Sequence, residues 1–135
     1  MLNPKNTALV IIDVQGRLAR IMQKADDLFK NLAMLIKGAR LLEVPIIWME
    51  QLPDKLGSTV EEVSVHLDGL QPIAKDVFSC GQNAEFNSKL AEIDPENIVL
   101  AGIETHVCVY QSAMDLLKKN YNVEVVADAT STRLE

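Results

Sequence analysis

The sequence lacks any hydrophobic run long enough to cross a membrane. Its 135 residues hold apolar runs at 8–12, 44–49 and 98–101, all far below the ~20 residues that a membrane-spanning helix needs. Residues 1–6 are polar and provide no apolar core for a signal peptide. These absences predict a cytoplasmic protein with no membrane partner.

Cysteine, glycine and positive charge are also scarce. There are two cysteines and six glycines, and 13 basic against 19 acidic residues leave a formal net charge of −6. Because an acidic surface repels phosphate backbones, a nucleic-acid partner is disfavoured. No GxGxxG or GK[ST] loop is present to cradle a nucleotide, and the cysteines and histidines do not have zinc-ligand spacing. We therefore expect no cofactor, and two free thiols.

What the sequence does contain is an alternation of buried strands and amphipathic helices. Continuous apolar runs suit strands that are covered on both faces, and they predict strands at residues 7–13, 45–50, 72–75, 97–102 and 123–128. Apolar spacings of three and four predict helices at 25–42, 83–93 and 107–119, and 52–70 is expected to be a loop with a short helix. Short connections imply right-handed crossovers. The predicted fold class is α/β, a three-layer open parallel sheet with helices on both faces.

The whole chain, residues 1–135, is expected to form one domain. The chain stops soon after the last predicted strand, so we expect a C-terminally shortened fold without its final helix and strand. Leu134 and Glu135 are interpreted as an expression-vector remnant.

Three chemically useful side chains follow predicted strands. Asp13, Lys75 and Cys108 all fall where the carboxyl ends of parallel strands meet, which is the ligand-binding edge of such sheets. Cys108 is expected at a helix N-terminus, where positive potential lowers a thiol pKa. A nucleophile, a base and an orienting cation together predict acyl-transfer chemistry. Taken singly, each residue has a simpler interpretation: a cap, a solvated charge and a small buried side chain.

Further polar and aromatic residues near the same edge are candidate substrate contacts, with surface or packing roles equally open. These residues are Gln15, Gln51, Phe78, Thr105 and His106.

The sequence also resembles a known family, the isochorismatase-like cysteine hydrolases. The resemblance lies in residues 11–15 (IIDVQ), 73–79 (IAKDVFS) and 101–109 (AGIETHVCV), with further matches at 50–57 and 125–133. It implies a hydrolase with the catalytic triad Asp13, Lys75 and Cys108 that forms a covalent adduct on the cysteine. It further implies an oxyanion hole made by the backbone amides of Glu104 and Cys108, and a cis peptide bond before Glu104.

The resemblance bears on metal, substrate and assembly as well. Residues 50–57 lack the histidine of the metal-binding nicotinamidases in this family, so no metal is expected. The implied substrate is a small amide, imide or similar carbonyl compound, and the implied assembly is a homo-oligomer. Two alternatives stay open: a catalytically silent member that binds a metabolite or protein partner, and redox sensing by Cys80 and Cys108.

Overall fold

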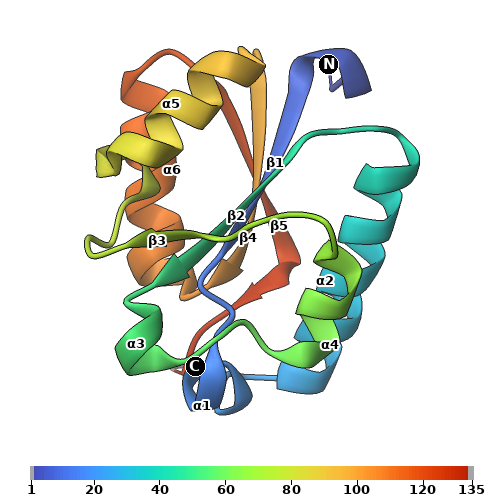
Figure 1. Cartoon of the computed structure of the whole chain (residues 1–135), viewed down its shortest axis with the longest axis vertical. Coiled ribbons are helices and arrows are strands. Elements are labelled where there is room, and N and C mark those ends of the chain that lie inside the picture. The colour runs from blue at the N-terminus through green and yellow to red at the C-terminus, as the bar shows by residue number, and fades with distance from the viewer. Residues whose placement is uncertain (1, 134–135) are drawn as a thin grey trace.

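The computed structural model describes residues 2–133 and contains a five-stranded, all-parallel sheet (Figure 1). Its strands are β1 (Thr7–Ile12), β2 (Ile46–Gln51), β3 (Ile73–Lys75), β4 (Asn97–Ile103) and β5 (Asn122–Ser131). The strand order is β3-β2-β1-β4-β5. The predicted fold class is therefore confirmed, and each predicted strand is present within a few residues of its expected bounds.

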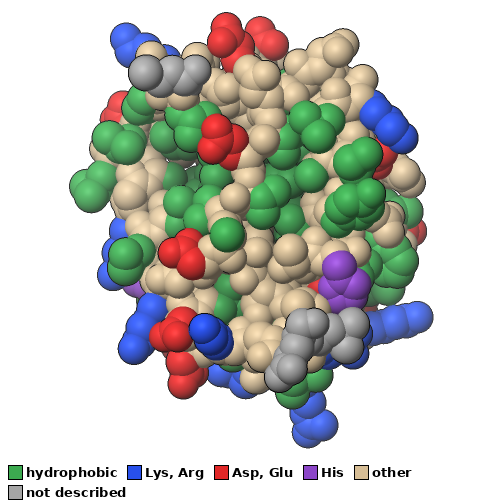
Figure 2. Space-filling model, turned by 180° about the vertical axis from the view of Figure 1, so that it is seen from behind, with side chains coloured by type: hydrophobic (Ala, Val, Ile, Leu, Met, Phe, Trp, Pro, Cys, Tyr) green, Lys and Arg blue, Asp and Glu red, His purple; other side chains and the backbone are tan. Residues whose placement is uncertain are grey.

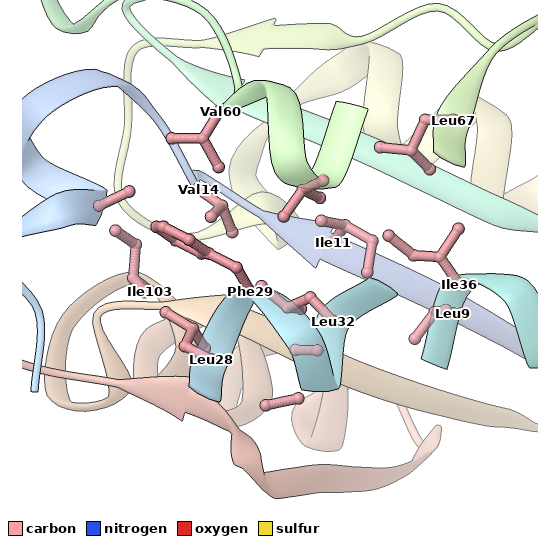
Figure 3. Packing of buried hydrophobic residues seen from close by; sticks show 14 of the residues in the cluster. Leu9, Ile11, Val14, Leu28, Phe29, Leu32, Ile36, Val60, Leu67 and Ile103 are labelled. Atoms are coloured by element: carbon pink, nitrogen blue, oxygen red, sulfur yellow. The ribbon is translucent and has the colours of Figure 1, made fainter. Parts of the chain in front are cut away.

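The central strand β1 shows why this sequence forms a three-layer fold. All six of its residues are buried, and because side chains alternate across a strand, they divide between two cores. Leu9 and Ile11 pack with α2 (Ala25–Leu41) and α4 (Glu61–Ser64), as Figure 3 shows. Val10 and Ile12 pack on the other face, against α5 (Ala84–Ile93) and α6 (Tyr110–Lys118). A strand covered on both faces has to be apolar throughout.

The connecting segments differ more from the sequence-based expectations. The segment at 52–70, expected as a loop with a short helix, contains two short helices, α3 (Pro53–Leu56) and α4, and a 3₁₀ turn at Val65–Leu67. The short helix α1 (Gly16–Arg20) was not predicted. The helix expected from residue 107 instead begins at Tyr110, after a π-helical turn at Thr105–Val109. Cys108 therefore lies near the start of a helical segment, as expected, but in its π-helical first turn, which leads directly into α6.

One side of the molecule leaves apolar side chains uncovered. Met34 and Leu42 of the α2 region and Val125 of β5 are exposed, and a groove of about 390 Å³ lies between the N-terminal segment and α2. Figure 2 shows hydrophobic side chains gathered on the face seen from behind. Within the described residues, every helix is too short or too polar to cross a membrane. The expected remnant at Leu134 and Glu135 lies outside the described residues.

Gly102 of β4 pairs with Ile12 of β1 and leaves no room there for a side chain. Its φ of 127° is open to glycine, and an added Cβ would collide with the carbonyl oxygen of Ile12. We expect Gly102→Ala to lower the free energy of unfolding by about 2–4 kcal/mol, from backbone strain and overpacking together. Gly38→Ala in α2 is the matched control, because nothing lies within 4 Å of its added Cβ. That variant should gain about 0.5–1 kcal/mol in urea unfolding; equal effects of both changes would contradict this packing.

Candidate active site

The strand order brings the three predicted catalytic residues together at the carboxyl edge of the sheet. Asp13 follows β1, Lys75 ends β3, and Cys108 lies in the turn after β4. The Lys75 Nζ lies 2.7 Å from Asp13 Oδ2 and 3.6 Å from Cys108 Sγ. Asp13, Lys75 and Cys108 are 4%, 3% and 7% exposed. A carboxylate, an ammonium and a thiol thus form one buried cluster.

The ammonium group of Lys75 is held from several directions. Besides Asp13, it donates to Gln51 Oε1 at 2.7 Å and to the carbonyl oxygens of Val77 and Phe78 at 3.1 and 3.0 Å. The side chain of Lys75 crosses β2 to reach Asp13, since β2 separates their strands. Because all of these oxygens accept hydrogen bonds from Nζ, they hold the ammonium group in one position.

Asp13 keeps one carboxylate oxygen available. Lys75 binds Oδ2, whereas the buried Oδ1 has no hydrogen-bond partner among the described residues. Burial raises the pKa of Asp13 above its ordinary value, although Lys75 and the Cys108 thiol act in the opposite direction. The nearby Glu50 carboxylate adds to the increase. A buried, unpaired carboxylate oxygen with a raised pKa is suited to accept a proton.

The surroundings of Cys108 disfavour the thiolate form of its side chain. Burial and the negative charge of Asp13 raise the pKa of Cys108 to about 12, despite the opposing effect of Lys75. The prediction of a lowered pKa was therefore wrong, because desolvation outweighs the positive potential of the turn. Cys80 is also a free, buried thiol, and burial raises its pKa to about 12. Any attack by Cys108 must accordingly transfer its proton to a neighbouring base.

The segment leading to Cys108 has an unusual backbone. The Ile103–Glu104 peptide bond is cis, and the carbonyl oxygen of Glu104 accepts hydrogen bonds from Val107 N at 3.1 Å and Val109 N at 3.2 Å. The bond from Val109 spans five residues, which is the π-helical pattern. Both residues expected to form the oxyanion hole, Glu104 and Cys108, therefore belong to one tightly bonded turn.

The predicted substrate contacts fall into two groups. Phe78, Thr105 and His106 reach the surface or its edge, and Phe78 is 53% exposed. Gln15 and Gln51 are buried, and their amides are already bonded. Gln15 donates to the carbonyls of Gln51 and Gly57 and accepts from Gln51 N at 2.6 Å. The amide of Gln15 thus joins the start of α1 to the ends of β2 and α3.

The side chains of two acidic residues near the site, Glu50 and Glu104, were given no role in the sequence interpretation. Glu50 Oε2 accepts hydrogen bonds from Thr59 N and Oγ1, at 2.8 and 2.7 Å. The Glu104 carboxylate is bonded to Arg133. Arg133 lies within the matching stretch 125–133, so its place in that motif was the available signal. Among residues 2–133, no group of three or more histidine, cysteine or acidic side chains is arranged to hold a metal ion.

The chain belongs to the isochorismatase family, since the model of the isochorismatase domain matches residues 7–135. An isochorismatase domain-containing protein 1 from Danio rerio is 36% identical, over 98% of this chain and 46% of its own length. An isochorismatase domain-containing protein 2 from the same fish is 34% identical, over 98% of this chain and 66% of its own length. The chain thus spans about half to two thirds of these curated relatives.

Solved structures share the same fold. A structure called MAR1 ribonuclease from Caenorhabditis elegans is 37% identical and has a TM-score of 0.91, covering 99% of this chain and 69% of that one. YcaC from Pseudomonas aeruginosa, described with covalent acrylamide, is 26% identical with a TM-score of 0.89 and covers 98% of this chain and 67% of that one.

Proposed function

We propose that the protein is a cysteine-dependent hydrolase of small amide, imide or similar carbonyl compounds. The observation that carries the proposal is the buried cluster in which Lys75 Nζ contacts both Asp13 and Cys108, at 2.7 and 3.6 Å. A nucleophile beside a base, with a cation that orients both, is the arrangement that covalent catalysis requires.

The reaction begins when the Cys108 sulfur attacks the substrate carbonyl carbon and the thiol proton passes to Asp13. The carbonyl oxygen becomes an oxyanion, which the backbone amides of Glu104 and Cys108 stabilise. When the tetrahedral intermediate collapses, the carbon–nitrogen bond breaks and Asp13 returns the proton to the leaving nitrogen. A water molecule, deprotonated by Asp13, then attacks the thioester and releases the acid and the Cys108 thiol.

We assign a role to each residue of the site from the hydrogen bonds that it makes. Lys75 occupies Asp13 Oδ2 and leaves Oδ1 unpartnered within the described residues, so Oδ1 is the oxygen that exchanges the proton. Gln51 and two carbonyl groups hold Lys75. Gln15 acts one step further away, through the backbone of Gln51. Phe78, Thr105 and His106 are proposed to contact the small-molecule substrate.

The relatives support a reactive thiol more than any one substrate. Acrylamide is an electrophile that thiols attack, and the YcaC structure is described with acrylamide attached covalently. The ribonuclease name of the Caenorhabditis elegans structure suggests RNA cleavage as a competing function. The net charge of −6 disfavours a polyanionic substrate here.

The test is intact-mass spectrometry of the native chain treated with acrylamide and with a panel of small amides. We expect one acrylamide adduct on Cys108, and an acyl adduct with at least one amide. Asp13→Asn should slow both, because the proton acceptor is lost. Labelling of Cys80 alone, or an RNA substrate cleaved while Cys108 is replaced by alanine, would contradict the proposal.

The catalytic rate should depend on pH through Asp13. Because Asp13 accepts a proton only when ionised, kcat/KM should fall as pH drops through its pKa, which burial raises above the ordinary 3.8. The acid limb of the profile should therefore lie above that value. At higher pH we expect a plateau rather than the ~10-fold rise per unit of a free thiol below its pKa. A profile that rises steadily towards the Cys108 pKa of about 12 would contradict Asp13 as the base.

One observation favours the alternative of a silent family member. The Cys108 thiol is buried and its pKa is raised to about 12, as for a structural cysteine. Adduct formation decides between the two functions, because a silent member would bind ligands reversibly and leave Cys108 unmodified.

Self-association and cytoplasmic location stay predictions. A neighbour from Escherichia coli is described as an octameric hydrolase, and at 23% identity its likeness concerns the fold. A relative from Phytophthora sojae, 32% identical, is named a secreted effector.

A further inference from the structure

Glu104 and Arg133 form a partly buried ion pair beside the catalytic turn. Arg133 donates to the Glu104 carboxylate from its backbone N at 3.3 Å and from Nε and Nη2 at 3.2 Å each. The Glu104 side chain is 8% exposed, against 53% for Arg133. The guanidinium group and the backbone N–H of Arg133 thus both donate hydrogen bonds to the buried carboxylate of Glu104.

The pair connects two segments that are distant in sequence. Arg133 follows the end of β5, whereas Glu104 follows β4 and begins the turn that contains Cys108. The same residue, Glu104, supplies the carbonyl oxygen that closes the π-helical turn onto Val109. Any rotation of Glu104 therefore moves the backbone amides of the turn, and the Arg133 bonds oppose such a rotation.

The direction of the Glu104 pKa shift supports an ion pair between Glu104 and Arg133. Burial opposes ionisation of Glu104, but the hydrogen bonds and the charge of Arg133 outweigh it and hold the pKa of this carboxyl below its ordinary value. A bidentate Arg–carboxylate contact also adds geometric specificity that a single lysine contact would lack.

The geometry points to Glu104 and Arg133 as positioning residues for the oxyanion hole, acting through the turn and without touching the reacting atoms. This inference rests on the proposed function, because it presumes attack by Cys108 on a carbonyl group. On this inference, Arg133, which follows β5, helps to position the oxyanion hole, although it does not belong to the triad.

The test separates oxyanion binding from thiol reactivity. Iodoacetamide alkylates a thiol by displacing iodide and places no new charge on a carbonyl oxygen. Propanal adds reversibly instead: the Cys108 sulfur bonds to the carbonyl carbon, the thiol proton passes to Asp13, and the electron pair of the C=O bond moves to the aldehyde oxygen, which becomes an alkoxide that the amides of the turn can bind. Protection of Cys108 from iodoacetamide by propanal, followed by intact mass, therefore measures how well the turn binds that oxygen.

Arg133→Gln should weaken propanal protection about tenfold, because slight misplacement of hydrogen-bond donors is enough to lose that much. The alkylation rate without propanal should stay unchanged, and Arg133→Lys should restore part of the protection. Arg20→Gln is the matched control, since it breaks a surface ion pair to Glu62 with a 2.7 Å contact and should change neither quantity. If Arg133→Gln melts early, Arg133→Lys replaces it, and a smaller fall in propanal protection is then expected because the lysine keeps the charge but not the bidentate contact.

The outcomes distinguish this inference from the proposed function. Unchanged protection in Arg133→Gln, or an equal fall in alkylation, would overturn the positioning role while leaving Cys108 as the nucleophile. Failure of iodoacetamide to modify Cys108 in the native chain would overturn both.

Discussion

Replacing Cys108 with alanine is expected to reduce turnover by at least about 10³-fold, because the covalent route is lost and only water attack in the bound complex remains. Cys108→Ser should be almost as inactive, since a hydroxyl is a far weaker nucleophile than a sulfur whose proton Asp13 removes. The measurement is kcat on the amide that gives the acyl adduct, together with the absence of that adduct by mass.

Cys80→Ala is the control for the Cys108 result. Cys80 is fully buried in the core on the α5 and α6 side, so its truncation should cost about 1–2 kcal/mol in stability and leave kcat near the native value. Native turnover in Cys108→Ala, or equal losses in the two variants, would exclude a nucleophilic Cys108.

Removing the charge of Lys75 is expected to destabilise the protein strongly. Lys75→Met leaves the Asp13 carboxylate buried without its 2.7 Å partner, and breaking one side of a buried ion pair costs about 3–5 kcal/mol. Turnover should be lost as well, because Asp13 is no longer held in position. Urea unfolding gives the stability change, and the amide assay gives the activity.

The double variant Asp13→Asn with Lys75→Met separates the two effects. Removing both charges relieves the isolated carboxylate, so stability should recover by about half or more of the loss, while activity stays absent. Asparagine suits position 13, whose φ of 57° is left-handed. Lys119→Met provides a matched lysine control, since within residues 2–133 its Nζ donates to two neutral acceptors, Gly81 O and Asn87 Oδ1. A loss in Lys75→Met no larger than in Lys119→Met would contradict a buried ion pair.

The strands and the long helices were predicted well because their pattern of apolar and polar residues repeats regularly along the chain. The helix expected at 25–42 ends at Leu41, and the strand expected at 7–13 ends at Ile12. The short helix α1 was missed because the hydrogen bonds at its start come from residues that are distant in the sequence. At the start of α1, for example, Gly16 N donates to Ser58 O and the Gln15 amide donates to Gly57 O. No local pattern of residues reveals such partners.

For the candidate site as well, the positions of the residues could be predicted from the sequence, whereas their ionisation and their contacts could not. Asp13, Lys75 and Cys108 were selected because they follow apolar runs, and the sheet brings them together as the parallel arrangement requires. The ionisation state of Cys108 was predicted with the wrong sign, because burial raises the pKa to about 12 and burial is not visible in a linear sequence. Gln51 was chosen as a substrate contact, which stays a prediction, and no sequence pattern indicated that its Oε1 accepts a hydrogen bond from the Lys75 ammonium.

By itself, the sequence determined the α/β class, the strands and major helices, and which residues fall at the carboxyl ends of the strands. These properties follow from apolar periodicity, which is a local consequence of backbone geometry. Only the tertiary structure decided that Lys75 reaches Asp13 across β2, that burial raises the pKa of the Cys108 thiol, and that Arg133 binds the Glu104 carboxylate. Distances and desolvation depend on which distant segments pack together, and that packing is a property of the whole chain.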